Sequence, residues 1–225
     1  MIEPVFHSEW SVRQGTKADI PFLALCNYEA SSPAPGFCYW DPLLAELGTP
    51  TMAFIQALFA ADALAWGRCE EFLIVEERGR PIGGASGFTM DADDYRPLQL
   101  DRLPAIAQLL GWSAAVLAQF QHGYEAVWSD PRDITLAPSA PWTIERVAVI
   151  PEARGRGVAQ YLLRALLDRG QTLGHAAAGI AVTLGNEPAR RVYEAVGFQL
   201  YVSYGAAYFD GNFPGTIKYR VPLAA

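Results

Sequence analysis

The chain has 225 residues, enough for one large domain or two small ones, and it is 51% hydrophobic and 18% charged. This composition is typical of a globular protein and excludes a disordered chain. The net charge of −7 argues against nucleic acid as the main partner. An acidic protein of this kind agrees only weakly with a cationic substrate.

The cysteines, the histidines and the hydropathy indicate what kind of globular protein this is. Cys26, Cys38 and Cys69 form no C-x-x-C pair, so we expect free or buried thiols in a cytoplasmic protein. The histidines show no metal-ligand spacing, and no metal is predicted. Residues 1–10 lack the features of a secretory signal. Residues 103–120 are the least polar long stretch, but polar residues interrupt them, which favours a buried or partner-facing helix and no membrane association.

The first part of the chain predicts a strand, two helices and a hairpin. The expected elements are a strand at 11–14, helices at 20–29 and 50–66, and strands at 71–77 and 81–90. A Ser/Pro/Gly cluster at 31–36 separates the two helices. Aromatic residues follow that cluster, so the loop between the helices joins polar turn residues to an apolar patch.

The second part alternates strands and helices after a long interruption at 91–140, which contains a helix candidate at 103–121. The expected elements are strands at 142–149, 179–184, 199–208 and 216–221, and helices at 158–169 and 188–196. Strand–helix alternation favours parallel pairing, and the hairpins favour antiparallel pairing elsewhere. We therefore expect a mixed α/β sheet in a single domain, 1–225.

A glycine-rich basic turn, Arg154–Ala159, lies between the strand at 142–149 and the helix that follows. The first N–H groups of a helix have no intrahelical partner, and the helix dipole favours an anion there. Gly155 and Gly157 let the main chain approach phosphate oxygens. Arg154 and Arg156 add charge-assisted donors. The pattern predicts a diphosphate site.

Glu145 is a candidate catalytic carboxylate on the strand before this turn. By the period of two, Thr143, Glu145, Val147 and Val149 share one face of the strand. A carboxylate there would lie near whatever the phosphate ligand carries. The alternative is an edge or surface residue paired with Arg146 or another arginine, and the residues alone leave both open.

Tyr193 lies in an apolar stripe with Ala189, Val192 and Val196, spaced for one face of a helix. On spacing alone this pattern favours a core aromatic whose hydroxyl is satisfied. Asn186 ends the preceding strand and is a candidate cap for this helix.

Two segments together resemble a known family. Residues 145–151 (ERVAVIP) followed by 154–159 (RGRGVA) resemble motif A of the GCN5-related N-acetyltransferases (GNAT). Residues 186–198 (NEPARRVYEAVGF) resemble motif B of the same family, in the same order and at ordinary spacing. The match is specific over about 142–201, and residues 12–88 are similar in layout only.

The resemblance implies a GNAT-like fold: a mostly antiparallel sheet with a central parallel strand pair flanked by helices, and a helical insertion (91–140) between the third and fourth strands. It implies acetyl-CoA as the phosphate ligand. Tyr193 would act as the general acid near the sulfur, and Asn186 would lie along the pantetheine arm. The resemblance implies further cofactor contacts from main-chain groups of Val147, Ala148 and Val149 and from a pyrophosphate turn of Arg154, Gly155, Arg156, Gly157, Val158 and Ala159.

The implied reaction is direct transfer of an acetyl group to a primary amine. Glu145, directly or through water, could accept the proton that the amine must lose. A fixed backbone N–H could stabilise the oxyanion, and a phenol could protonate the departing thiolate. One departure is that residues 180–184 contain no acid, whereas some members place a base there. That departure supports an alternative, a non-catalytic acyl-CoA-binding sensor or scaffold on the same fold.

The acceptor side is less determined. In the family, the loop between the first two helices lines the acceptor pocket, and Phe37, Tyr39 and Trp40 occupy that place here. Aromatics could hold a cationic or aromatic amine, or they could form a cluster that seals the loop. For 91–140, three roles stay open: a cover over the cleft, a homodimer surface, or an extra packed helix. The acceptor could be a small-molecule amine or a protein amine, and the acyl group could be longer than acetyl.

Overall fold

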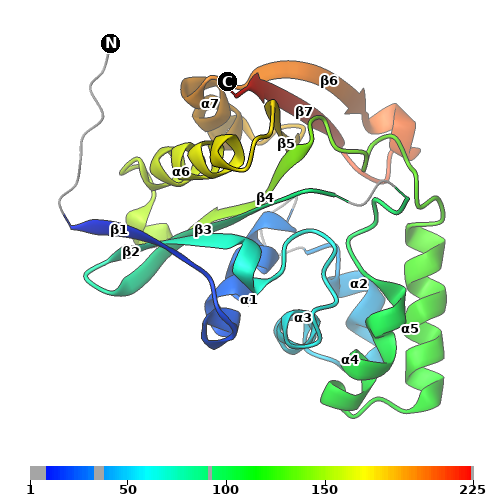
Figure 1. Cartoon of the computed structure of the whole chain (residues 1–225). Coiled ribbons are helices and arrows are strands. Elements are labelled where there is room, and N and C mark those ends of the chain that lie inside the picture. The colour runs from blue at the N-terminus through cyan, green and yellow to red at the C-terminus, as the bar shows by residue number, and fades with distance from the viewer. Residues whose placement is uncertain (1–8, 33–37, 91–92, 224–225) are drawn as a thin grey trace.

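The computed structural model describes residues 9–32, 38–90 and 93–223, which form one seven-stranded sheet with helices on both faces (Figure 1). The strand order is β1-β2-β3-β4-β5-β7-β6. The strands are β1 Trp10–Gln14, β2 Phe72–Glu77, β3 Arg80–Phe88, β4 Trp142–Val149, β5 Ala177–Thr183, β6 Gln199–Gly205 and β7 Gly215–Pro222. The α-helices are α1 Ile20–Ala30, α2 Asp41–Leu44, α3 Thr51–Ala60, α4 Leu103–Leu110, α5 Ala114–Val127, α6 Val158–Thr172 and α7 Glu187–Val196.

The sheet is antiparallel except for the central β4–β5 pair, which is parallel. This confirms the expected mixed sheet. The parallel pair is the one joined by α6, because a parallel connection needs a crossover rather than a hairpin. Short 3₁₀ turns connect several elements: η1 Lys17–Asp19, η2 Ala45–Leu47, η3 Cys69–Glu71, η4 Leu100–Arg102, η5 Pro151–Ala153 and η6 Ala206–Phe209.

Two hydrophobic clusters lie on the two faces of the sheet. One forms under α1 and α3, and it includes Phe54, Phe59 and Phe72. The other forms under α6 and α7, and it includes Trp142 and Leu162. Figure 1 shows α6 and α7 on one face and α1 and α3 on the other. The active-site candidates on β4 therefore lie at the centre of a sheet that is covered on both sides.

One predicted helix and one predicted strand are shorter than expected. The helix expected at 50–66 ends at Ala60, because Asp62 adopts a left-handed φ of 51° and the Ala63 N–H bonds back to Leu58. The residues after it bond to the insertion instead, with Gln99 N–H donating to Ala63 O. The strand expected at 199–208 ends at Gly205 and continues as η6.

The helix expected at 103–121 is two helices, α4 and α5. Gly111 has φ 67°, which ends α4, and the Ser113 hydroxyl accepts a hydrogen bond from Val116 N–H at the start of α5. The sequence pattern was apolar on both sides of the break, so periodicity alone did not reveal it. Glycine and serine at these positions are the ordinary signals of a helix end and a helix start.

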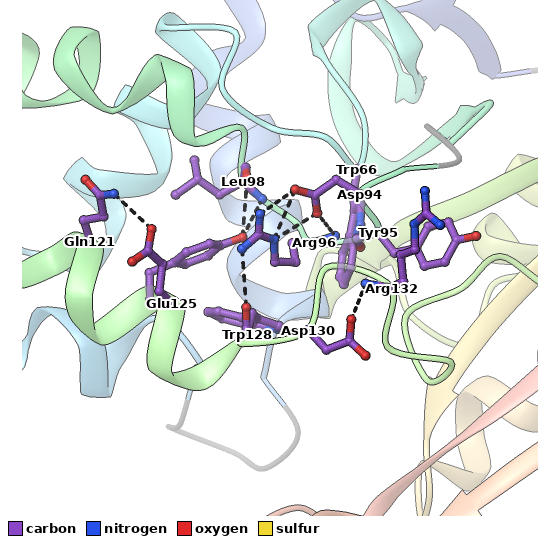
Figure 2. A network of polar contacts seen from close by, with 11 residues as sticks. Trp66, Asp94, Tyr95, Arg96, Leu98, Gln121, Glu125, Trp128, Asp130 and Arg132 are labelled. Atoms are coloured by element: carbon purple, nitrogen blue, oxygen red, sulfur yellow. Dashed lines mark hydrogen bonds and ion pairs between the residues drawn. The ribbon is translucent and has the colours of Figure 1, made fainter.

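These two helices pack onto the core below the sheet. Phe120 and Tyr124 of α5 are buried, and the Phe120 ring lies 5.0 Å from Phe54 of α3. Polar contacts hold the loop before α4: Trp66 Nε1 donates to Tyr95 O at 2.8 Å, and the Tyr124 hydroxyl accepts from Leu98 N–H at 3.0 Å. Figure 2 shows Trp66, Tyr95 and Leu98 in this network. This packing is what an extra packed helix requires, and the cover over the cleft and the homodimer surface stay predictions that it does not test.

Candidate active site

The site begins where β4 and β5 separate. The strands pair over three residue pairs, the last being Ile144 with Ile180, although β4 continues to Val149 and β5 to Thr183. Beyond that point the β4–β5 ladder supplies no partner for the β4 main chain. A gap between two parallel strands exposes backbone donors and acceptors along a line that an extended ligand can follow.

A bulge in β4 produces the separation. The β3–β4 register shifts between Gly84 and Ser86, and Arg146 opposite this shift has a left-handed φ of 63°. An extra residue in one strand bends it and increases its twist. A left-handed backbone is costly for a residue other than glycine, so the surrounding structure must hold Arg146 in place.

The bulge also corrects the predicted faces of β4. Trp142 and Ile144 lie in the cluster under α6, and after the bulge Val147 and Val149 pack against the same cluster. Glu145 precedes the extra residue and points to the opposite face, the face covered by α1. The prediction that Glu145, Val147 and Val149 share one face is therefore wrong, because the extra residue shifts the period of two.

Glu145 lies in an environment that disfavours its charged form. Burial raises the pKa of its carboxyl to about 7, while the nearby guanidinium of Arg146 and ammonium of Lys218 act in the opposite direction. The side chain is half-buried, and it forms no hydrogen bond with another described side chain. A carboxyl that is about half ionised near neutral pH can accept a proton and release it.

Tyr193, on the buried face of α7, lies close enough to Glu145 for the carboxylate charge to shift the pKa of its phenol. Burial raises the pKa of the Tyr193 phenol, and the Glu145 carboxylate and Tyr219 add to the shift. The Tyr193 ring packs against Tyr219 with centroids 6.1 Å apart. The Tyr219 hydroxyl is bonded to Arg190 and Glu194, each at 3.1 Å. Within the described part of the chain, the Tyr193 hydroxyl has no hydrogen-bond partner. Its proton is therefore free to be donated to a ligand.

The glycine turn places unpaired main-chain donors at the start of α6. Gly155 and Gly157 have φ of 73° and 89°, and Gly157 is the N-cap. The first helical bond of α6 runs from Tyr161 N–H to Gly157 O. The N–H groups of Val158 and Ala159 therefore have no main-chain partner among the described residues, and they lie at the positive end of a 15-residue helix.

The arginines of the turn are held by carboxylates. Arg154 Nη2 lies 3.0 Å from Glu29, and Arg156 pairs with Glu77 beside the ring of Trp10. These ion pairs are largely exposed, so exchanging a carboxylate for a phosphate costs little. The main-chain donors, rather than the arginine side chains, are the preformed part of this site.

Asn186 lies at the other edge of the gap, after β5. Its Oδ1 accepts a hydrogen bond from Ala189 N–H at 3.2 Å, so it caps α7 as expected. Glu187 and Pro188 complete the first turn of this helix, and Gly197 with φ 105° ends it. The cap fixes the orientation of α7 and therefore the position of Tyr193 at the gap.

On the acceptor side, the structure describes two of the three predicted aromatics, Tyr39 and Trp40, whose ring centroids lie 4.9 Å apart. Phe37 lies outside the described residues. Tyr39 is half-buried, and its hydroxyl accepts a hydrogen bond from Arg146 at 2.8 Å. Trp40 is fully buried, with its ring 5.4 Å from Phe54 and its indole N–H bonded to Asn27. Tyr39 therefore faces the residues of the bulge, and Trp40 belongs to the core.

Sequence reasoning missed two buried cations near Glu145. Lys218 of β7 is only 4% exposed, and its ammonium donates to Ile134 O at 2.7 Å and to Ala137 O. Burial lowers the pKa of Lys218 to about 8. Arg146 is also 4% exposed. In an alternating strand, Lys218 suggests a solvent face, but the loop before β4 accepts its hydrogen bonds and the Tyr204 ring of β6 lies 5.7 Å from its ammonium. The rarity of lysine in this chain was the available signal.

Several other features bear on the chemistry. The cysteines are free and buried, as expected, and burial raises the pKa of the Cys26 thiol to about 12. The described ranges hold no group of three His, Cys, Asp or Glu side chains that could bind a metal. No single described helix is long and apolar enough to cross a membrane; 41–47 and 51–60 meet that test only as a pair bent by 106°.

A mixed sheet that opens between two parallel strands, with a glycine turn and unpaired donors at the following helix, offers a place for an extended ligand that carries phosphate. Comparison with known proteins gives the family. The model described as "Acetyltransferase (GNAT) family" matches residues 39–198, and the chain belongs to this family. The resemblance found in the two motifs is thereby confirmed, and this family uses acetyl-CoA.

Solved structures show the same fold at low sequence identity. An N-acetyltransferase from Staphylococcus aureus Mu50 is 19% identical with a TM-score of 0.62, covering 94% of this chain and 100% of its own. A putative acetyltransferase from Salmonella typhimurium, solved with its cofactor acetyl-CoA, is 16% identical with a TM-score of 0.53, covering 96% and 95%. An agmatine N-acetyltransferase is 16% identical with a TM-score of 0.50, covering 96% and 100%. No curated protein matches the chain.

Proposed function

We propose that the protein is an acetyl-CoA-dependent N-acetyltransferase that moves an acetyl group to a primary amine by direct attack. Glu145 is the general base and Tyr193 the general acid. The observation that supports this most strongly is the pairing of a carboxyl whose pKa is about 7 with an uncommitted tyrosine hydroxyl at the gap between β4 and β5. Two titratable groups with different tasks at one site are typical of acid–base catalysis.

The residues present fit the cofactor. Acetyl-CoA supplies an activated acetyl thioester when it is bound. The turn from Arg154 to Ala159, with Gly155 and Gly157 in left-handed conformations, offers main-chain donors for the pyrophosphate. The main chain from Val147 to Val149 has no β5 partner and would pair with the pantetheine amides. The Asn186 side chain, at the opposite edge of the gap, would lie along the pantetheine.

Glu145 would remove the proton that blocks attack. A primary amine is protonated at neutral pH and has no free electron pair until it loses that proton. The Glu145 carboxyl, at a pKa of about 7, is ionised often enough to accept it and weak enough to release it. Lys218 is a poorer candidate because two backbone carbonyls hold its ammonium in the charged form.

The opposite charge develops on the carbonyl oxygen and then on sulfur. A main-chain N–H of β4 beyond the bulge can donate to that oxygen without first giving up a bond to β5. Tyr193 can protonate the departing thiolate, and the charge of Glu145 helps to keep the phenol protonated until then. No covalent enzyme intermediate is needed. Burial also raises the pKa of Cys38 and Cys69 to about 11, so the thiols are poor nucleophiles.

The acceptor is an amine on a small molecule or on a protein. The test is turnover of the Tyr193→Phe variant, measured as thiol release with a panel of primary amines, next to acetyl-CoA affinity measured by calorimetry. We expect kcat to fall by about 10²-fold or more while the affinity is retained. Tyr219→Phe is the matched control, because its hydroxyl is already bonded to Arg190 and Glu194. Unchanged turnover in Tyr193→Phe would remove Tyr193 from the mechanism.

A further inference from the structure

Arg146, the residue at the β4 bulge, is a buried cation with three of its five N–H donors unused. Its Nη1 donates to Ser31 Oγ at 2.6 Å and to the Tyr39 hydroxyl at 2.8 Å. Its Nε and Nη2 have no hydrogen-bond partner among the described residues. It also forms no ion pair with a described carboxylate. A buried guanidinium normally has a carboxylate partner, because burying an uncompensated charge is costly.

The unused donors lie on one edge of the guanidinium. Nε–H and one Nη2–H point in the same direction, and their spacing matches the two oxygens of a carboxylate. Nη1, on the other edge, is the group that Ser31 and Tyr39 hold. The protein therefore fixes the guanidinium by one nitrogen and leaves its bidentate edge for another group.

The neighbouring polar groups decide which charge a ligand of this site would carry. Asn27 is fully buried, and its Oδ1 accepts from Trp40 Nε1 and from Ser31 Oγ, each at 3.3 Å. Its Nδ2 has no partner within the described ranges. The three unsatisfied side-chain atoms of the described buried set are thus all donors: Asn27 Nδ2, Arg146 Nε and Arg146 Nη2. A cluster that has spare donors and no spare acceptors is complementary to an anion.

Aromatic rings pack against Arg146. The Arg146 guanidinium carbon lies 5.4 Å from the centroid of the Trp66 ring, and Trp66 is held by Tyr95 in the network of Figure 2. The Tyr39 ring lies 5.6 Å from Trp128 at the end of α5. These three rings are each only partly buried, and two of them, Tyr39 and Trp66, contact Arg146 directly.

We propose that the Arg146 edge binds a carboxylate of the acceptor, so that the acceptor is an amine that also carries a carboxylate, as an amino acid does. This inference rests on the proposed function, because it places the acceptor amine at Glu145, the residue before Arg146. The bulge then has two roles: it opens β4 from β5 on the cofactor side, and it presents a guanidinium on the acceptor side. Trp128, which follows α5, places the end of the insertion beside Tyr39 at this site.

The first test uses the wild-type protein and needs no variant to fold. L-amino acids are compared with their own α-carboxamides as acceptors, with agmatine and phenethylamine as amines without a carboxylate. The values compared are pH-independent kcat/KM, because an amide lowers the pKa of the neighbouring amine. We expect the preferred acid to exceed its carboxamide by about tenfold or more, the usual effect of a charged hydrogen bond. Equal values for acids and carboxamides would overturn the proposal.

The second test replaces Arg146 and so removes the Nε–Nη2 edge of its guanidinium. Arg146→Met should abolish the preference for the acid through a higher acceptor KM, with acetyl-CoA affinity unchanged, and Arg146→Lys should restore only part of it because an ammonium is not bidentate. Arg102→Met is the matched control, since that exposed arginine lies away from the sheet on η4. A preference for the acid that persists in a folded Arg146→Met protein would contradict the assignment.

Failure of the two proposals can be told apart. Transfer to simple amines with no carboxylate preference leaves the acetyltransferase in place and overturns the Arg146 site. If no amine is acetylated, the proposed function fails, and the site is tested by calorimetry of wild type with an N-acetyl amino acid against its carboxamide. Tighter binding of the acid, lost in Arg146→Met, would still support the carboxylate site. Equal binding, or none of either, would overturn it.

Discussion

Replacing Glu145 with glutamine separates the proposed base from its neighbours. The amide has the same shape but cannot accept a proton at neutral pH. The wild-type carboxyl has a pKa raised by burial from 4.5 to about 7. At pH 6 such a group is ionised in about one molecule in ten, and at pH 8 in about nine in ten. We therefore expect kcat/KM to rise about tenfold from pH 6 to a plateau above pH 8.

The direction of this limb follows from the groups that face Glu145, which are Arg146, Lys218 and Tyr193. Both cations lower the pKa of the carboxyl, so Lys218→Met should move the limb to higher pH. In Glu145→Gln the limb near pH 7 should disappear, and kcat should fall by about 10² to 10⁴-fold. An acceptor whose amine pKa lies well above 8 keeps its own titration away from this limb.

The same substitution has a consequence for stability. A carboxyl whose folded pKa lies above its unfolded value stabilises the fold fully below pH 4.5, and this stabilisation is lost as pH rises through about 7. The shift of about 2.5 units corresponds to a free energy on the order of 3 kcal/mol. Glu145→Gln should therefore equal wild type at pH 4 and be more stable at pH 8, by up to this amount.

Both readouts come from one pair of proteins. Initial rates of thiol release between pH 5.5 and 9 give the limb, and urea unfolding at pH 4 and pH 8 gives the free energy of unfolding. Two results would refute the reasoning: a flat rate profile across pH 6–8 in wild type, or a Glu145→Gln protein that keeps nearly full turnover. A variant that is inactive but no more stable than wild type at pH 8 would show that the ionised Glu145 carboxylate does not destabilise the fold.

Three further predictions concern the turn, the insertion and the thiols. Gly157→Ala should weaken acetyl-CoA binding several-fold in calorimetry, because alanine at φ 89° costs about 1 kcal/mol or more; Gly205→Ala, with ordinary φ and open space, should not. Phe120→Ala should lower the free energy of unfolding in urea by about 3–5 kcal/mol, whereas Val127→Ala on the exposed face of α5 should change it little, and equal losses would contradict the packing. Iodoacetamide at pH 8 should leave activity intact over minutes, since the buried cysteines have pKa values of about 11 to 12; rapid inactivation would point to a reactive thiol.

The sequence predicted the cofactor side of the site because local rules govern it. A glycine turn with positive φ and a capped helix depends on residues that are neighbours in the chain, and Gly157 and Asn186 take the expected positions. The mixed sheet followed from strand–helix alternation in the same way. Gly111 shows the limit of periodicity, since an apolar pattern continued through a glycine that ends the helix.

The acceptor side depends on tertiary structure and was poorly predicted. The bulge at Arg146 has no sequence signal, because a left-handed arginine is held only by its surroundings. It reverses the face of Val147 relative to Glu145. The loop before β4 accepts the hydrogen bonds of the buried Lys218, and its contact at Ala137 joins segments 81 residues apart. Charges of this kind become visible only when the fold brings them together.

The central claim is that this chain transfers an acetyl group from acetyl-CoA to an amine, using Glu145 and Tyr193. The most direct measurement is mass spectrometry of the acceptor after incubation with the protein and acetyl-CoA, with released CoA thiol counted in the same sample. We predict one acetyl group gained by the amine for each thiol released, and loss of both in Glu145→Gln. Acetyl-CoA binding without thiol release for any amine would contradict the claim and indicate a sensor or scaffold.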